Sequence, residues 1–166
     1  SIDWNKKKNC GIPKLQEILK KCPEIIKYQL EVKTNSIRDC DIILNELINL
    51  FPNEKSCKKI IVTSFNTYLL EKLLKIAPYI PRGLISDQRN ILRKAKSIKC
   101  EMVCIDHRIV TRSWIKQIID AGIYVSLWTV NNPSLMEDYF NWGVDSIITD
   151  YPSMALPLVN RLKLRN

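Results

Sequence analysis

The stretch at positions 123–152, IYVSLWTVNNPSLMEDYFNWGVDSIITDYP, decides the fold because it predicts strand, helix and strand with few residues to spare. Residues 123–130 alternate and are rich in β-branched and aromatic side chains, and residues 144–149 form a second short apolar run. Between them, Asn132 and Pro133 suit the start of a helix, and Gly143 suits its end. The two strands are therefore predicted to run parallel, joined by a covering helix.

The same alternation extends over the rest of the chain. Apolar runs begin near residues 28, 60, 83, 102, 123 and 144, and a helical pattern separates each from the next. Pro13 is expected to open a short first helix, Asp87 to cap a basic helix that runs to residue 97, and Pro157 to interrupt the last helix. The sequence thus predicts an α/β fold of parallel βα repeats, with residues 1–166 forming a single domain.

Composition limits the class of protein. The 166 residues are 46% hydrophobic and 26% charged, which is ordinary for one globular domain. No apolar run approaches the length of a membrane span, and the opening SIDWNKKKNC lacks the apolar core of a signal peptide, so a cytoplasmic protein without a transmembrane segment is expected. None of the six cysteines stands in a CxxC pair, which favours reduced thiols over a zinc site or disulfides.

The formal charge of +9 favours anionic partners such as phosphate esters, lipid headgroups or nucleic acid. The basic residues are spread over several separate clusters, which is more typical of solvated surface. No aromatic residues are interleaved with them as a base-stacking platform would require, so nucleic acid is not expected as a partner.

Several motifs occur in an order that resembles the glycerophosphodiester phosphodiesterase family. They are IPKLQEIL at 12–19, LEVK at 30–33, SFN at 64–66, PYIPRGLI at 78–85, and WTVN followed by GVDSIITDYP at 128–152. The family has a TIM-barrel fold of eight strands, and a complete barrel typically needs about 250 residues. The six strands predicted here correspond by position to the third through eighth. The resemblance thus implies a partial TIM barrel in which the first two βα units are missing before Ser1.

An open array of six strands has two edges whose backbone groups lack partners. Such a chain is expected to be unstable, dimeric, swapped, or completed by another chain.

The resemblance also implies site residues. Glu31 matches the family's metal-binding glutamate, and Lys33 matches a neighbouring lysine that faces the phosphate. Because they are two residues apart on a strand, they point to the same side. The pattern alone favours a pair at a strand end that is satisfied by its own contact and by water, and the resemblance favours the site role instead. Trp128 matches an aromatic residue that lines the substrate pocket, and its alternative is core packing.

Other polar residues are expected to be structural. His107, the only histidine, follows the strand that would be the sixth of a full barrel, whereas the family's two catalytic histidines lie near its N-terminus. Ser64 and Asn131 are expected to hold loops, and Asp150 a turn or a cap. No catalytic residue is therefore predicted in this chain.

As a family member, the protein would hydrolyse glycerophosphodiesters to glycerol 3-phosphate and an alcohol with a divalent cation, Mg²⁺ or Ca²⁺. The family's two catalytic histidines and its first two carboxylate ligands of the metal have no counterpart in this sequence. The chain alone is therefore expected to be weakly active or inactive. An N-terminal fragment or a second copy of the chain is the expected partner. The alternatives are a non-enzymatic basic module that binds anions, headgroups or nucleic acid, and a gene remnant.

Overall fold

The computed structural model describes residues 11–34 and 36–163, with side chains as far as residue 160. These residues form one sheet of parallel strands in the order β1-β2-β3-β4-β5-β6, so each strand pairs with its neighbours in the sequence. The strands are β1 (Tyr28–Glu31), β2 (Ile60–Ser64), β3 (Arg82–Ser86), β4 (Met102–Asp106), β5 (Tyr124–Trp128) and β6 (Ser146–Ile147). The prediction of parallel βα repeats is confirmed.

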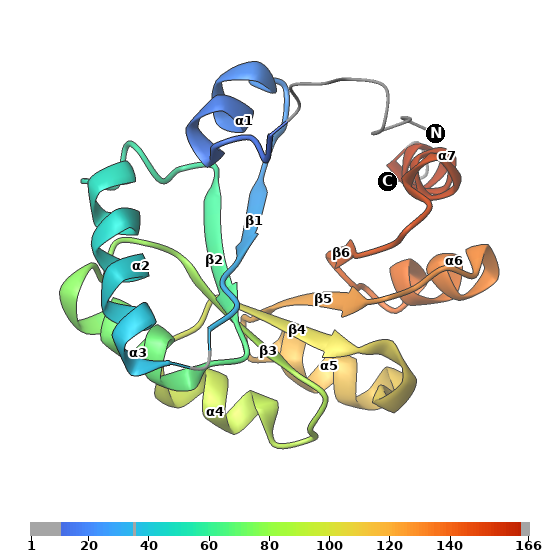
Figure 1. Cartoon of the computed structure of the whole chain (residues 1–166). Coiled ribbons are helices and arrows are strands. Elements are labelled where there is room, and N and C mark those ends of the chain that lie inside the picture. Colours follow the sequence, from blue (N-terminus) through green and yellow to red (C-terminus); the bar gives the residue numbers. More distant parts are fainter. Residues whose placement is uncertain (1–10, 35, 164–166) are drawn as a thin grey trace.

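The sheet curls into a half-barrel with the middle helices on its convex side (Figure 1). The helices are α1 (Leu15–Lys21), α2 (Ile37–Leu50), α3 (Thr67–Ile76), α4 (Ile91–Ser97), α5 (Arg112–Asp120), α6 (Pro133–Asn141) and α7 (Pro152–Lys163), with a 3₁₀ turn at His107–Ile109. Strands β1 and β6 lie at the two ends of the arc, and each has one neighbouring strand among the described residues. Both sheet edges are open there, as the sequence predicted.

The core lies between the convex face of the sheet and the helices. Outward side chains of the central strands, such as Val62, Leu84 and Val103, are fully buried against apolar helix residues. The fully buried helix residues include Leu44, Leu69, Leu73, Ile91, Ile115 and Met136. Burying a side chain of this kind stabilises the fold by about 1.5–3 kcal/mol. Helix amphipathicity therefore fixes which side of the sheet the helices cover.

The concave face carries small polar side chains instead. The Gln29 amide donates to Thr63 Oγ1 at 3.5 Å and to Cys104 Sγ at 3.3 Å, and Ser146 Oγ donates to Ser126 Oγ at 2.8 Å. Burial raises the pKa of the Cys104 thiol to about 12, so it remains a neutral member of this layer. The layer ends on both edge strands, with Gln29 on β1 and Ser146 on β6.

Side-chain caps mark four helix starts, among them the one predicted at Asn132. Ser36, Asn66, Thr111 and Asn132 each accept a backbone hydrogen bond as N-cap residues. Gly143 ends α6 at φ +92°, a conformation that L side chains rarely adopt.

Three local predictions were wrong. Helix α1 begins at Leu15 rather than at Pro13. Helix α4 begins at Ile91 because a turn, in which Ser86 Oγ accepts from the Gln88 amide, comes between β3 and the helix, so Asp87 is not its cap. Helix α7 continues through Pro157. A proline there removes one backbone donor, and the helix tolerates that loss.

The structure also bears on membrane-spanning helices and on the cysteines. In the part of the chain that the structure describes, no helix is both long enough and apolar enough to cross a membrane. The five cysteines there are free thiols, and Cys10 lies outside the described residues.

Candidate active site

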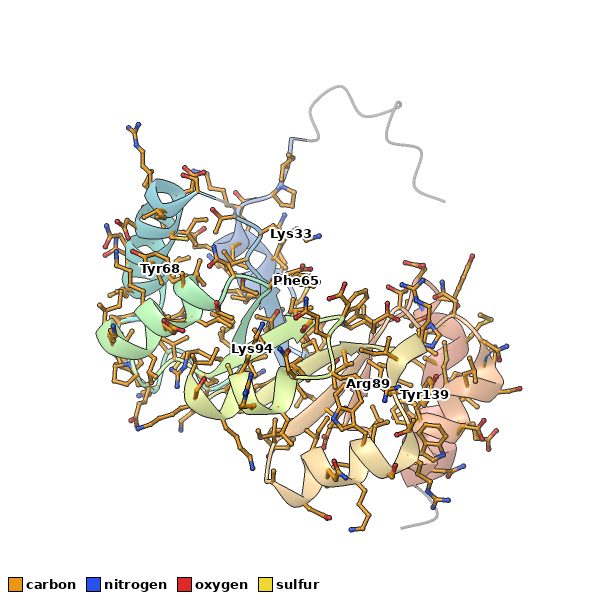
Figure 2. All side chains as sticks on the ribbon, turned by 90° about the horizontal axis from the view of Figure 1, so that it is seen from below. Lys33, Phe65, Tyr68, Arg89, Lys94 and Tyr139 are labelled. Atoms are coloured by element: carbon orange, nitrogen blue, oxygen red, sulfur yellow. The ribbon has the colours of Figure 1, made fainter. Side chains whose placement is uncertain are left out.

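A pocket of about 250 Å³ lies at the C-terminal ends of the strands, on the concave side of the half-barrel. Glu31 and Trp128 are the last residues of β1 and β5, Lys33 lies two residues beyond β1, and all three line the pocket. Figure 2 shows Lys33 and Phe65, another lining residue, next to each other. Residues almost 100 positions apart in the sequence therefore meet in one site, because parallel strands end at the same edge of the sheet.

The two charged residues of the pocket contact each other. Lys33 Nζ lies 3.6 Å from Glu31 Oε2, and the two side chains are 79% and 36% exposed. An exposed pair of this kind contributes at most about 1 kcal/mol. Neither side chain is held away from the pocket by other contacts among the described residues, so both the cation and the carboxylate are available to a ligand.

Two aromatic rings also line the pocket. The rings of Phe65 and Trp128 pack edge to face with their centroids 5.9 Å apart. Trp128 Nε1 is buried and has no hydrogen-bond partner among the described residues, and a buried donor of this kind normally has one. Phe65 was not singled out from the sequence. Its position directly after a predicted strand, inside the SFN motif, was the available signal.

A larger open cleft of about 820 Å³ adjoins this pocket and shares Glu31, Lys33 and Phe65 with it. Its other polar lining residues are Thr34, Asp39 in the first turn of α2, Ser64 and Asn66. Asn66 also caps α3 and donates to the Thr34 carbonyl at 3.1 Å. The loops after β1 and β2 are thus tied together around the mouth of the site.

The WTVN and ITD motifs hold the loops around Trp128. Asn131 Oδ1 accepts from Thr149 Oγ1 at 3.1 Å and from the Asp150 amide at 3.0 Å, while Asn131 Nδ2 donates to Asp150 Oδ2 at 2.8 Å. Ser64 Oγ donates to the Val32 carbonyl at 2.7 Å. The loop roles predicted for Ser64 and Asn131 are confirmed, and Asp150 takes part in the same loop contact.

His107 lies outside the pocket, as expected of a structural residue. Its Nδ1 lies 3.2 Å from the Tyr139 hydroxyl, and the two rings pack edge to face. Figure 2 shows Tyr139 apart from Lys33, among the C-terminal elements. The neighbouring Asp106, at the end of β4, is 4% exposed and is bound by Arg108 through its Nε at 2.9 Å and its backbone amide at 2.9 Å.

This ion pair predicts a pH dependence of stability. The side-chain hydrogen bond from Arg108 lowers the pKa of the Asp106 carboxyl below its ordinary value of 3.8. A lowered folded-state pKa stabilises the fold above the unfolded value, and the contribution is lost as the pH falls through the folded value. Arg108→Ala is therefore expected to lower the free energy of unfolding at neutral pH, with the difference from the parent shrinking below pH 3.8.

Urea unfolding at a series of pH values measures this effect. Lys116→Ala is the matched control, because Lys116 pairs with the exposed carboxylate of Asp120 at 2.9 Å. A constant gap between Arg108→Ala and the parent at every pH would contradict the assignment.

The described residues do not form a complete site for a divalent cation. No group of three or more His, Cys, Asp or Glu side chains within residues 11–34 and 36–163 is placed to hold a metal. Mg²⁺ and Ca²⁺ require several oxygen ligands, and Glu31 is the carboxylate that lines the 250 Å³ pocket. These residues therefore do not fit a metal without further ligands.

Comparison with known proteins identifies the family of this chain. The model of the glycerophosphoryl diester phosphodiesterase family matches residues 2–154. A Bacillus subtilis glycerophosphodiester phosphodiesterase is 22% identical over 153 residues, which are 86% of this chain and 52% of that protein. The Bacillus subtilis protein YhdW, whose assignment to the same activity is provisional, is 28% identical over 87% of this chain and 61% of its own length.

Solved structures show the same fold. An Oleispira antarctica phosphodiesterase in complex with the product sn-glycerol-3-phosphate superimposes with a TM-score of 0.75 at 20% identity, covering 89% of this chain and 61% of that one. A Parabacteroides distasonis glycerophosphodiester phosphodiesterase gives 0.73 at 21% identity, covering 90% and 65%. This chain spans between half and two thirds of these relatives. It belongs to the glycerophosphoryl diester phosphodiesterase family.

Proposed function

We propose that this chain carries the substrate-binding part of a glycerophosphodiester phosphodiesterase, which hydrolyses a glycerophosphodiester to glycerol 3-phosphate and an alcohol. The observation that carries the proposal is the meeting of Glu31, Lys33 and Trp128 in one pocket at the C-terminal ends of the strands. Reacting groups in TIM barrels lie at this end, and the family match covers the segments that supply all three residues.

Each residue has a role that its chemistry supports. The Lys33 ammonium is 79% exposed and can pair with a phosphate oxygen. The ring of Trp128, backed by Phe65, offers an apolar wall against which the carbon skeleton of glycerol can pack. Glu31 supplies one carboxylate toward a divalent cation, Mg²⁺ or Ca²⁺, whose other ligands come from outside the described residues.

The remaining catalytic parts are proposed to come from a partner. His107 contacts Tyr139 and does not line the pocket, so an acid or base must be supplied by an N-terminal segment or by another chain. Without it, this chain is expected to bind the product but to turn over substrate slowly or not at all. The cytoplasmic location expected from the sequence stays a prediction.

Binding of glycerol 3-phosphate tests the proposal without requiring turnover. The compound is expected to shift the indole N–H resonance of Trp128, and Lys33→Gln is expected to weaken its binding about tenfold, since the variant loses a charge-assisted contact to phosphate. Lys94→Gln is the matched control because Lys94 lies on α4, away from Lys33 (Figure 2).

Two outcomes would contradict this reading of the pocket. One is equal weakening by both lysine variants, which would indicate a general effect of net charge. The other is saturable binding that leaves the Trp128 resonance unmoved, which would place the anion elsewhere.

A further inference from the structure

A second hollow lies at the opposite end of the strands from the candidate active site. It has a volume of about 430 Å³, within the range of small-molecule sites. Helix α1, the start of β1 and the segment between α2 and β2 surround it, and its lining comprises Leu19, Tyr28, Phe51, Lys55, Ser56, Lys58, Lys59 and Ile60. Leu19 ends the IPKLQEIL motif, but the proposed activity does not use this hollow, which we call the N-terminal groove.

The floor of the N-terminal groove is apolar and anchored. Phe51 and Ile60 are 3% and 2% exposed and belong to the core of the half-barrel. Leu19 and Tyr28 are partly buried and pack against that core from the side of α1. Phe51 and Ile60 are already buried, so the apolar surface that an aliphatic chain would remove from water belongs to the partly buried Leu19 and Tyr28. Covering it is favourable by about 25 cal/mol per Å².

The rim of the N-terminal groove is cationic. Lys55, Lys58 and Lys59 are exposed, and no Asp or Glu is among the lining residues. Lys59 Nζ donates to the Pro23 carbonyl at 2.7 Å, which fixes its ammonium beside the groove. Within the described residues, Lys55 and Lys58 make no ion pair. Three positive charges within five positions repel one another, and a bound anion would relieve that repulsion.

The backbone that carries these lysines is already ordered. In the turn after α2, the Ser56 amide donates to Asn53 Oδ1 at 3.1 Å and Ser56 Oγ donates to the Asn53 carbonyl at 2.6 Å. The Tyr79 hydroxyl donates to the Phe51 carbonyl at 3.0 Å, which ties the start of this turn to the segment before β3. On the other wall, the Tyr28 hydroxyl donates to the Cys22 carbonyl at the end of α1. Such preorganisation lowers the entropy cost of binding.

We propose that the N-terminal groove binds a single-chain aliphatic anion, with the chain on the apolar floor and the anionic head among Lys55, Lys58 and Lys59. This inference is independent of the proposed hydrolysis, because the groove shares no residue with the pocket of Glu31, Lys33 and Trp128. An anion without a chain uses only the rim, and an uncharged chain uses only the floor. Both should therefore bind more weakly than the amphiphile.

Titration of the full chain with octanoate, acetate and 1-octanol, followed by backbone amide resonances, tests the proposal. Octanoate is expected to saturate and to shift the amides of Leu19, Tyr28 and Ile60, with a dissociation constant about tenfold below those of acetate and 1-octanol. A carboxylate probe is used because the pocket proposed for glycerol 3-phosphate is built around a phosphate contact.

Variants separate the groove from general charge effects. The double change Lys55→Gln and Lys58→Gln is expected to weaken octanoate binding about tenfold, as loss of two exposed ion pairs predicts. The double change Lys94→Gln and Lys96→Gln on α4 removes the same net charge and is expected to leave binding unchanged. Thermal unfolding of both variants checks that each is folded, and Lys55→Gln alone serves if the double variant is not.

Four results would overturn the proposal. These are octanoate shifts that do not saturate, acetate or 1-octanol binding as tightly as octanoate, equal weakening by the control variant, and loss of octanoate binding in Lys33→Gln. The last result would move the amphiphile to the other end of the strands. It would contradict binding of the amphiphile in the N-terminal groove but would not contradict the proposed function.

Discussion

Release of glycerol 3-phosphate from glycerophosphocholine is expected to stay near background with this chain alone. It should rise by about 10²–10⁴-fold when a segment containing the first two βα units of a relative is added, since a positioned acid or base contributes about that factor. The Bacillus subtilis enzyme, of which this chain covers 52%, is a suitable source of that segment.

The structure gives physical reasons for such complementation. Strands β1 and β6 each lack a second neighbour among the described residues, so both edges can accept a parallel strand. Helix α1 contains no buried residue, and Ile26 beyond it is 81% exposed. Near the other edge, Tyr151 and Leu156 are 53% and 60% exposed. Added βα units would cover apolar surface at both ends of the arc.

The assay is made with and without Mg²⁺ or Ca²⁺. Glu31→Gln is expected to abolish the gain, whereas Glu46→Gln, an exposed carboxylate on α2 outside both pockets, is expected to leave it unchanged. Substantial turnover by this chain alone would show that it holds an acid or base that we have not identified. Tight binding of the segment with no turnover would support completion of the barrel but contradict the catalytic role.

Replacing Arg82 by alanine is expected to lower the free energy of unfolding by about 3–4 kcal/mol, among the largest effects of any single change. Arg82 is 4% exposed at the start of β3. Its Nη1 donates to the Pro78 and Ile80 carbonyls at 3.1 and 2.6 Å, and its Nη2 donates to the Lys99 carbonyl at 3.2 Å. One guanidinium thereby joins the turn before β3 to the turn before β4.

Two opposing contributions set the size of the effect. Burial lowers the pKa of the Arg82 guanidinium, which reflects the cost of holding a charge away from water. Removing the side chain ends that cost, but it leaves three carbonyls without their donor and opens a cavity in a packed region. The contact to the Ile80 carbonyl is buried, and an unsatisfied buried acceptor costs about 1–3 kcal/mol. The cavity adds to this cost, so the losses exceed the gain.

Urea unfolding of three variants measures this balance. Arg82→Lys retains the charge but has one ammonium in place of a planar fork, so it is expected to lie between Arg82→Ala and the parent. Arg93→Ala, an exposed arginine on α4, should remain within about 0.5 kcal/mol of the parent. If Arg82→Ala were as stable as Arg93→Ala, the carbonyl contacts would carry no net stabilisation.

Sequence reasoning succeeded where the information is local and repeated. The helix start at Asn132 was predicted because a side-chain oxygen near a free backbone amide acts within a few residues. It failed at Asp87, where an intervening turn moved the helix start to Ile91. Strand lengths were also uncertain. The predicted run of residues 144–149 pairs only over Ser146–Ile147, at an edge with a single neighbouring strand.

What the sequence determined by itself was the order of strands and helices, their parallel direction and the family, because apolar periodicity and ordered motifs are written along the chain. Only the tertiary structure decided which side chains meet. In the tertiary structure Phe65 packs against Trp128, and His107 contacts the Tyr139 hydroxyl outside the pocket. Three lysines surround the apolar floor of the N-terminal groove at the other end of the strands. Such contacts depend on sheet curvature and register, which bring together residues far apart in the sequence and which no local pattern encodes.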